Sequence, residues 1–464
     1  MNHPRLTHLT AVLVGTAVFF TLLTAAGTKK AAQAVSGTVR TAAVVCTGAV
    51  CYDAPQTLSA ADFCDFDGTG AVTQGAVLSF TELVDLSVEG LQEGAGTGAS
   101  NYQVLESALT LIERFTVQQR ERYKNTLFRL TLPPGVYELD GSGQPLPIYQ
   151  NTWLSMQGVT LRKSDSACSA LLRNTPMGSS FTGYEANSNL VLTGGVWEVP
   201  LKRFDPCSEE DRFSVLRFGH CRNVLLAGVT VSGCVNGHHL ELCGVENCSV
   251  VNSTFQGYLD TEYHSKGDKK EAIQLDVVTN RWVAPGFPDF DDTITRDVLI
   301  YGCTFRNLCR GIGGHNAVYG RSYTKIAIQH NTFTHLSGEG VYALNYAHAD
   351  ISHNKMKQVA GGVTLLALTD HPDDAYYAPA QGDLPTFDRL PIQSHHLSVT
   401  DNQIEVTDGS EPAITISGGV YGDTQFADAY GGRTFWVEDV TLARNQVMGG
   451  GIVQSYVRDQ TKRA

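Results

Sequence analysis

The sequence lacks two features that would point to common classes of binding protein. It has 11 cysteines, but no two of them have the CxxC spacing that is typical of structural zinc sites. Lys and Arg number 34 against 47 Asp and Glu, the formal net charge is −13, and no long run carries one sign. A nucleic-acid partner requires a basic stripe that neutralises phosphates, so binding of DNA or RNA is not expected. The 464 residues are 42% hydrophobic, which is enough for a large folded core.

An apolar block near the beginning of the sequence predicts export. Residues Leu9–Ala26 are uncharged, follow a basic residue and precede the small-residue segment Ala32–Ala34. This order indicates a signal peptide at residues 1–34. The lysines at 29–30 leave open an uncleaved anchor, since the block almost reaches the length that spans a bilayer. Both interpretations predict a secreted or cell-surface protein, whose contact with a membrane would be made only by an uncleaved N-terminal segment.

The next segment, residues 35–98, is rich in Gly, Ala and Thr and is interpreted as an N-terminal extension of the main domain, residues 99–464. Within the extension, Asp65–Thr73 resembles half of a calcium-binding loop, but Ala76 stands at the twelfth position, where the loop requires an acid. A plain turn is favoured, and calcium is the one cofactor left open. Apolar residues at helical spacing predict a capping helix over residues 102–123.

A short repeat runs through the main domain and indicates a solenoid. Each copy reads apolar, x, apolar, x, a small or polar turn residue, x, x, apolar, and several copies follow one another at about 23–28 residues. A second strand with alternating apolar residues precedes most of the later copies. The pattern predicts an all-β parallel β-helix. The nine copies are residues 154–161, 190–197, 224–231, 249–255, 298–305, 326–333, 349–356, 397–404 and 440–447.

A recurrent asparagine marks the turn inside the later copies. Asn side chains stacked on successive coils can donate hydrogen bonds to one another, and Asn tolerates the left-handed conformation of a sharp bend. A structural role is therefore expected for Asn331, Asn354, Asn402 and Asn445.

Polar residues of the second strands gather on the outside of a few adjacent coils. Because side chains alternate between faces, strands in register would bring these residues together. One outward row reads Arg217, Glu241, Gln274, Gly313 and Tyr342. The next row includes Cys243, Asp276 and His315. The spacing of strands places Glu241 and Asp276 about 8 Å apart.

These rows supply candidates for glycan chemistry. A separation of about 8 Å suits the acid and base of an inverting glycosidase, so Glu241 and Asp276 are the expected catalytic pair, with His315 as modulator. Arginines, or Lys266, would bind a substrate carboxylate or remove the proton next to it, as a lyase does. Long insertions after the same strand carry aromatic residues that suit sugar rings. The expected substrate-binding residues are Arg217, His239, Gln274, Arg310, Tyr319, Arg321 and Tyr342.

Each candidate also has a simpler interpretation. Outward acids can form a solvated face, Gln274 can be a hydrogen-bonding spacer, and His315 can be an ordinary surface group. His238 and His239 point to opposite faces of a strand, which disfavours a shared metal ion, and no metal site is expected. The acidic segment Asp289–Asp292 is favoured as a turn over a calcium site. The cysteines of the repeats are expected to be small apolar residues of the coil.

Two groups of motifs resemble known proteins. A helix followed by Leu132–Leu139 (LPPGVYEL) resembles the opening of right-handed parallel β-helices of the pectate-lyase superfamily. The segments Glu271–Asp276, Asp291–Thr293 and Arg310–Thr324 are similar to those of exported bacterial β-helix repeat proteins. The motif set of polygalacturonases is missing, since Gly237–His239 reads Gly-His-His in place of Gly-His-Gly. The resemblance covers roughly residues 125–464 and implies the fold.

The expected function is that of an exported enzyme that cleaves an acidic or complex polysaccharide by hydrolysis. A polysaccharide lyase of the same superfamily is the alternative within that class. A surface solenoid that binds glycans without turnover is the alternative from another class.

Overall fold

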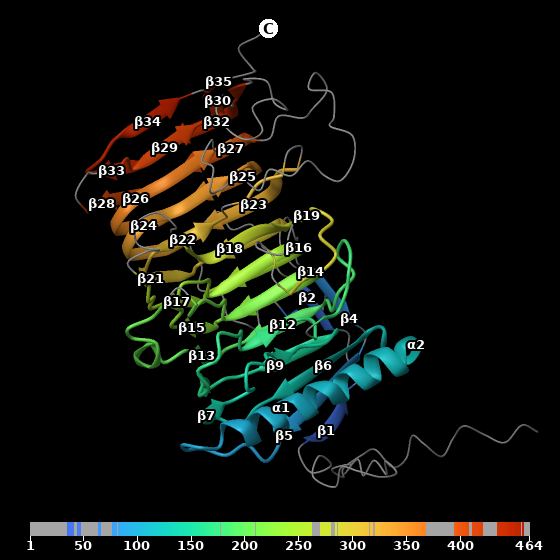
Figure 1. The fold of residues 1–464 in the computed structure, drawn as a ribbon. Helices are drawn as coiled ribbons and strands as arrows, with labels where there is room; N and C mark the ends of the chain where they lie inside the picture. The colour runs from blue at the N-terminus through green and yellow to red at the C-terminus, as the bar shows by residue number, and fades with distance from the viewer. Residues whose placement is uncertain are drawn as a thin grey trace, which may run out of the picture.

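In the computed structural model, the chain forms a long coil of parallel strands (Figure 1). The structure describes residues 35–40, 44–47, 64–65, 77–80 and 82–458, apart from 177, 209, 262–269, 280–283, 285, 315, 319–320, 368–393, 408–410, 421–433 and 456. In this part of the chain, 30 strands belong to one sheet that winds from coil to coil. The predicted all-β parallel β-helix is therefore confirmed.

The strands stack into three parallel ladders, one on each side of the coil. The first ladder consists of β8 (Leu146–Pro147), β11 (Leu172–Arg173), the first parts of β14 (Leu216–Ala227) and β16 (Leu240–Val251), β18 (Glu271–Val278), β22 (Arg310–Gly313), the last parts of β24 (Thr332–Leu344) and β26 (Lys355–Leu366), β29 (Ile414–Ser417) and β34 (Ile452–Ser455).

The second ladder consists of β5 (Glu82–Val88), β6 (Thr126–Thr131), β9 (Thr152–Ser155), β12 (Leu190–Thr193), the last parts of β14 and β16, β20 (Arg296–Tyr301), β23 (Tyr323–Gln329), β25 (Tyr346–Ser352), β27 (Ser394–Thr400), β32 (Val437–Ala443) and β35 (Val457–Arg458). The third consists of β7 (Gly135–Leu139), β10 (Val159–Lys163), β13 (Val196–Glu198), β15 (Thr230–Ser232), β17 (Thr254–Gln256), β21 (Thr304–Leu308), the first parts of β24 and β26, β28 (Gln403–Val406) and β33 (Gln446–Met448). Each predicted repeat spans a strand of the second ladder and the following strand of the third.

A few strands lie beside the ladders. The strand β1 (Val35–Arg40) pairs antiparallel with β5, and β19 (Thr293–Ile294) pairs antiparallel with the end of β18. The remaining antiparallel strands are β2 (Val44–Thr47), β3 (Cys64–Asp65) and β4 (Val77–Phe80) in one small sheet, and β30 (Gly419–Val420) with β31 (Thr434–Phe435) in another. Because β5 pairs in parallel with β6, the coil already includes residues that were assigned to the N-terminal extension.

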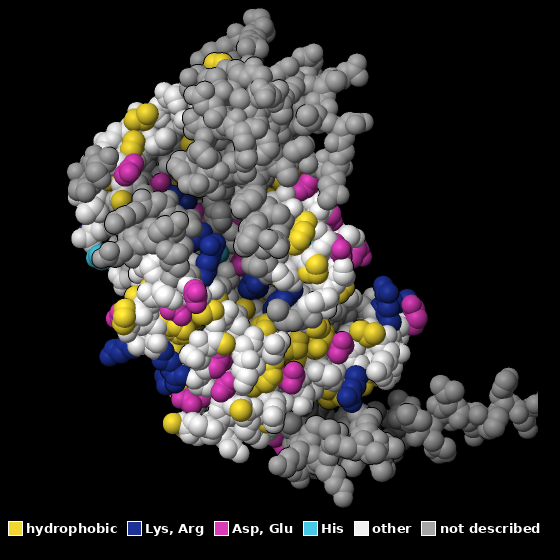
Figure 2. Space-filling model, in the orientation of Figure 1, with side chains coloured by type: hydrophobic (Ala, Val, Ile, Leu, Met, Phe, Trp, Pro, Cys, Tyr) yellow, Lys and Arg dark blue, Asp and Glu magenta, His cyan; other side chains and the backbone are white. Residues whose placement is uncertain are grey.

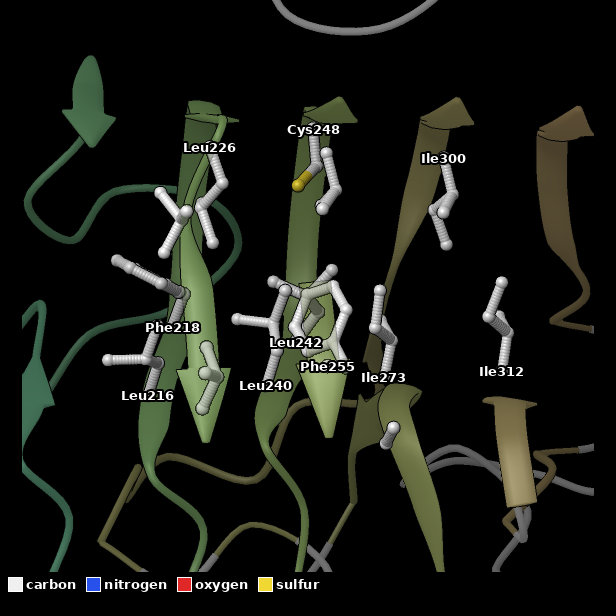
Figure 3. Packing of buried hydrophobic residues seen from close by; sticks show 14 of the residues in the cluster. Leu216, Phe218, Leu226, Leu240, Leu242, Cys248, Phe255, Ile273, Ile300 and Ile312 are labelled. Atoms are coloured by element: carbon white, nitrogen blue, oxygen red, sulfur yellow. The ribbon is translucent and has the colours of Figure 1, made fainter. Parts of the chain in front are cut away.

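The core fills the interior between the three ladders. Along the first ladder, Leu216, Leu240, Ile273 and Ile312 are register partners, and all are fully buried (Figure 3). Phenylalanines of the third ladder stack on one another inside the coil, with ring centroids 5.2 Å apart for Phe255 and Phe305 and 4.7 Å for Phe305 and Phe333. Identical residues on successive coils therefore form continuous apolar columns, and burial of these columns is what holds the coils together.

A helix packs against the first coils, as predicted. The helix α1 (Gly98–Glu113) begins four residues before the predicted start and continues through a π-helical turn, η2 (Arg114–Gln118), into α2 (Arg120–Tyr123). Leu105, Leu109 and Ile112 form its buried face and join the main core. A short 3₁₀ turn, η3 (Leu201–Arg203), is the one other helical element in the described residues.

The recurrent asparagines form the predicted stack. The Nδ2 of Asn331 donates to the Oδ1 of Asn354, Asn354 to Asn402, and Asn402 to Asn445, each at 3.0 Å. The expectation that these residues adopt the left-handed conformation is wrong. The residue before each of them does so, with φ between 56° and 58°, which leaves the Asn side chain to point inward. The four residues in the left-handed conformation are His330, His353, Asp401 and Arg444.

The cysteines of the repeats are buried free thiols, as predicted: Cys221, Cys234, Cys243, Cys248, Cys303 and Cys309. The predicted signal segment and most of the calcium-like segment Asp65–Thr73 lie outside the described residues. Among the helices that are described, none is long and apolar enough to cross a bilayer.

Candidate functional site

The predicted outward row lies in register on consecutive coils of the first ladder. The Cα partners are, in order, Arg173, Arg217, Glu241, Gln274, Gly313 and Tyr342. The residues beside them in each strand, such as Leu240 and Ile273, belong to the core. The row therefore faces away from the interior, and the register predicted from the alternation is confirmed. Figure 2 shows basic and acidic side chains interspersed with hydrophobic ones on one face of the molecule.

Glu241 is held by a buried ion pair. The Arg217 guanidinium donates from Nε to Oε2 at 2.9 Å and from Nη2 to Oε1 at 2.6 Å. Burial alone would raise the pKa of Glu241, but the charge and the hydrogen bonds of Arg217 outweigh it and lower that pKa below its usual value. Glu241 is therefore a carboxylate at neutral pH, with both oxygens held by Arg217.

Asp276 is fully buried and surrounded by donors. Its carboxylate accepts hydrogen bonds from Gln274 at 2.6 Å, Asn316 at 2.7 Å, Tyr323 at 3.1 Å and the backbone N–H of Val277 at 2.8 Å. Gln274 thus fills the role of hydrogen-bonding spacer. Since Asn316 and Tyr323 follow β22, the carboxylate also holds the chain between β22 and β23 against β18. Burial and then Asp276 raise the pKa of Tyr323 well above its usual value, so Tyr323 stays a donor.

The segment between β18 and β19 covers this part of the row. The Phe287 ring lies over two guanidinium groups, with its centroid 4.6 Å from Cζ of Arg173 and 5.2 Å from that of Arg217. Gly219 makes room for the ring, because a Cβ at that position would lie 2.5 Å from it. Phe287 packs with Cys243, and both are buried. The simpler interpretation of the outward acids as a solvated face is therefore wrong for Glu241 and Asp276, which are 3% and 0% exposed.

A second charged cluster lies one coil further along. Arg310 donates to Glu271 at 2.6 Å and to Glu339 at 2.8 Å, and its Cζ lies 3.8 Å from the ring centroid of Tyr342. Burial would lower the pKa of Arg310, but Glu339 and Glu271 outweigh it and raise that pKa, so the guanidinium stays charged. Tyr342 is half-buried, and the Glu339 side chain is 14% exposed. These two residues and Arg217, whose side chain is also 14% exposed, are the members of the row and its cluster that solvent reaches.

His239 does not face the outside, so its predicted role in binding substrate is wrong. Its ring is fully buried, lies edge-on to Phe255, and has Nε2 2.9 Å from the carbonyl oxygen of Gly257. Burial lowers the pKa of His239 to about 4, which keeps the ring neutral. His238 points the other way, with Nδ1 2.8 Å from the carbonyl oxygen of Glu271, so the expected opposite directions are confirmed.

The other predicted residues are only partly placed by the structure. Arg321 is exposed, and its backbone carbonyl accepts a hydrogen bond from Asn345 at 3.0 Å. His315, Tyr319 and Lys266 lie outside the described residues.

The acidic segment before β19 forms a turn. Asp291 accepts hydrogen bonds from the backbone N–H of Gly183 at 2.7 Å and from the Thr293 hydroxyl at 2.6 Å, while Asp289 contacts Ser180. These bonds attach the segment around residue 182 to the segment between β18 and β19, which also contains Phe287. The favoured interpretation of Asp289–Asp292 as a turn agrees with these contacts.

Several residues of the site were not predicted. Arg173 stands in a two-residue strand, β11, which is too short to show the alternation that revealed the other members. Glu271 lies one residue before the aligned stretch, and Asn316 and Tyr323 lie in or next to an insertion. Burial, followed by the charge of Arg217, lowers the pKa of Arg173 to about 10. The one signal that the sequence offered for Arg173 is a charged residue directly after three apolar residues, in the segment Ala170–Asn174.

Comparison with known proteins concerns the fold. No protein-family model matches the chain, and no curated protein matches its sequence. Among solved structures, a surface adhesin of Streptococcus pneumoniae, PfbA, is 15% identical, with a TM-score of 0.47 over 80% of this chain and 93% of that one. The chain has a right-handed parallel β-helix fold. This agrees with the resemblance of its motifs to the pectate-lyase superfamily.

Two further solved β-helix structures show the same level of likeness. An endo-xylogalacturonan hydrolase from Aspergillus tubingensis is 11% identical, with a TM-score of 0.41 over 80% of this chain and 92% of that one. A tailspike protein of E. coli bacteriophage HK620 is 12% identical, with a TM-score of 0.41 over 75% of this chain and 57% of that one. At such identities a likeness concerns the fold alone, so no activity is carried over from these β-helix proteins.

Proposed function

We propose that this protein is exported and acts on a polysaccharide at the outer face of its first ladder. The observation that carries the proposal is the outward row itself, with the Arg217–Glu241 pair, Asp276 and the Arg310–Tyr342 cluster on neighbouring coils. Buried ion pairs cost desolvation and contribute little net stability, so a coil selected for stability alone has no need of them. Charged groups beside a partly exposed aromatic ring suit the carboxylates and ring faces of an acidic glycan.

Hydrolysis is the reaction that we propose for this face. Glu241 and Asp276 project from adjacent coils, and the Gln274 side chain beside Glu241 donates to Asp276. Because Glu241 is ionised, as a general base must be, we assign it the role of base. Proton donation is then assigned to Asp276 after it has bound a proton, or to a group outside the described residues. Access of a substrate to Glu241 would require displacement of Phe287, whose ring lies over the Arg217 guanidinium.

Binding without turnover is the second candidate function. The observation in its favour is that both acids are buried and hydrogen-bonded, while Arg217, Tyr342 and Glu339 are the partly exposed members of the row and its cluster. Elimination has less support, because the pKa values of Arg217 and Arg310 are raised and neither guanidinium is suited to remove a proton.

Hydrolysis predicts a loss of product in two variants. The purified mature chain is screened against plant, host and bacterial glycans. The screen measures reducing ends, unsaturated products and retention of the protein on each glycan. With a glycan that the wild type cleaves, Glu241→Gln and Asp276→Asn are each expected to reduce the release of reducing ends by about 100-fold or more, because each removes a carboxylate that takes part in proton transfer.

The control is Glu405→Gln on the third ladder, away from the row, which is expected to release product at the wild-type rate. Each variant is assayed well below its own melting temperature, since both acids are buried. If the wild type is retained on a glycan but releases no product from it, the proposed function becomes binding in place of hydrolysis. Unsaturated products would replace it with elimination, and folded Glu241 and Asp276 variants with wild-type release would exclude these acids from the reaction.

A further inference from the structure

One column of residues at the start of the second ladder adopts the left-handed conformation on successive coils. Each member directly precedes one of the register partners that run from Thr152 and Leu190 to Leu397 and Val440, and has φ between 51° and 60°. The early members are asparagines that bond in sequence: Asn189 donates to Asn151 at 2.7 Å, and Asn223 to Asn189 at 2.7 Å. The whole column is Asn151, Asn189, Asn223, Asn247, Asp297, Lys325, His348, His396 and Asp439.

Three imidazoles meet in the later part of this column. The rings of His348 on β25 and His396 on β27 stack with centroids 4.8 Å apart, and His395 lies beside both. One ligand nitrogen from each of the three rings lies within 4.8 Å of the others. His348 and His396 are exposed and His395 is half-buried, so the group is accessible to an ion from solvent.

Two contacts hold the cluster together. The Nδ1 atoms of His395 and His396 are 2.6 Å apart, the distance of a hydrogen bond in which one ring donates to the other, and a metal ion would take the place of that proton. On the other side of His396, Nε2 lies 3.9 Å from Oδ2 of Asp439 on the next coil. A carboxylate behind an imidazole orients the ring and strengthens it as a metal ligand.

We propose that His348, His395 and His396 bind one divalent transition-metal ion of the zinc class, with Asp439 as the carboxylate that positions His396. Imidazole nitrogens suit Zn²⁺, Ni²⁺ and Cu²⁺, whereas Ca²⁺ and Mg²⁺ require oxygen ligands. Zinc–nitrogen distances of about 2.0–2.1 Å in a tetrahedron set the nitrogens about 3.3 Å apart. An ion between His395 and His396 would therefore require their Nδ1 atoms to separate from 2.6 Å, which the exposure of the His396 ring permits.

The ion would join two coils of the β-helix. β25, with His348, belongs to one coil, and β27, with His395 and His396, belongs to the next. Between them the chain leaves β26 at Leu366 and returns at Ser394. An ion held from both sides therefore stabilises the pairing of the coils on either side of this interval, because it binds the folded state and not the unfolded one. This site lies on the second ladder and is independent of the proposed action on polysaccharides.

The chain contains a matched control site. At the next corner, His330 and His353 stack with centroids 4.8 Å apart, both in the left-handed conformation, and Nε2 of His353 lies 3.9 Å from Oδ2 of Asp401. This corner has an equivalent pair of imidazoles and a carboxylate, which Arg444 also holds at 2.6 Å, but no third histidine among its register partners. The proposal therefore expects strong binding at one corner and not at the other.

The test is calorimetric titration of the full chain, without a histidine tag and with its thiols reduced, with ZnCl₂. The expected result is one ion per chain at micromolar affinity and a rise in melting temperature of a few degrees, with no response to CaCl₂. His348→Asn and His396→Asn are each expected to weaken zinc binding by at least tenfold. Asn is chosen because four coils of the same column carry Asn in this conformation, so the variants should fold. His353→Asn is expected to bind zinc as the wild type does.

Three results would overturn the proposal. The first is a wild-type chain that does not bind zinc at about 1 mM, far above the affinity of a three-histidine site. The second is equal weakening by His353→Asn and His348→Asn. The third is unchanged binding in a triple variant at positions 348, 395 and 396, which would assign the ion to thiols such as the exposed Cys168.

Discussion

Arg217→Met is expected to lower the free energy of unfolding at pH 7 by about 3–5 kcal/mol, because it leaves the Glu241 carboxylate buried without its cation. The double variant Arg217→Met, Glu241→Leu is expected to recover most of this loss, since the buried charge is then also gone. Equilibrium denaturation of the wild type and of the single and double variants measures both effects. A cost below about 1 kcal/mol for the single variant would mean that Glu241 has access to water.

The same pair predicts how stability depends on pH. The pKa of Glu241 is lower in the folded chain than its reference value of 4.5, so its ionised form stabilises the fold. That contribution is complete above pH 4.5 and is lost as the pH falls through the folded pKa. In Arg217→Met burial raises the pKa of Glu241, so the difference between the wild type and this variant should be largest near neutral pH, begin to shrink above pH 4.5 and vanish below the lowered pKa of the wild type. A difference that stays constant down to pH 3 would contradict the ion pair.

Asp276→Ala is expected to cost about 4 kcal/mol or more, because it leaves the Gln274, Asn316 and Val277 donors buried without this acceptor. The control is Asp350→Ala on the second ladder, where a half-buried carboxylate accepts from Gln329 and Ser352 and water can replace it. That change is expected to cost about 1 kcal/mol or less. Equal costs at the two positions would show that Asp276 is solvated and that the β18–β19 segment does not cover it.

The fold could be predicted from the sequence wherever successive coils carry similar residues at equivalent positions. Alternation of apolar residues gave the strands, their inward faces and the register of Arg217, Glu241, Gln274 and Tyr342, because a slip by one residue would expose the whole core. Stacked asparagines were predictable for the same reason, since identical residues at identical turns meet on adjacent coils.

The sequence was uninformative where the chain leaves the repeat. The burial of Glu241 and Asp276 depends on Phe287 and Asn316, which lie outside the regular strands and which no period relates to the ladders. It also depends on Tyr323, the first residue of β23, whose hydroxyl bonds from the second ladder to Asp276 in the first. His239 precedes its strand, so alternation did not apply to it. The left-handed conformation was assigned one residue too late. The recurrence of Asn331 and its partners identified the side chains that point inward, whereas the residue before each Asn makes the bend.

The most direct test of a polysaccharide site on the first ladder is the affinity of a glycan fragment for Tyr342→Ala. Tyr342 is half-buried on Arg310, and loss of a stacking ring is expected to weaken binding about tenfold. Thr441→Ala, exposed on the second ladder, is the control and should bind as the wild type does. The account predicts a weakened Tyr342→Ala variant that still melts as a folded protein. Unchanged affinity in that variant would contradict it.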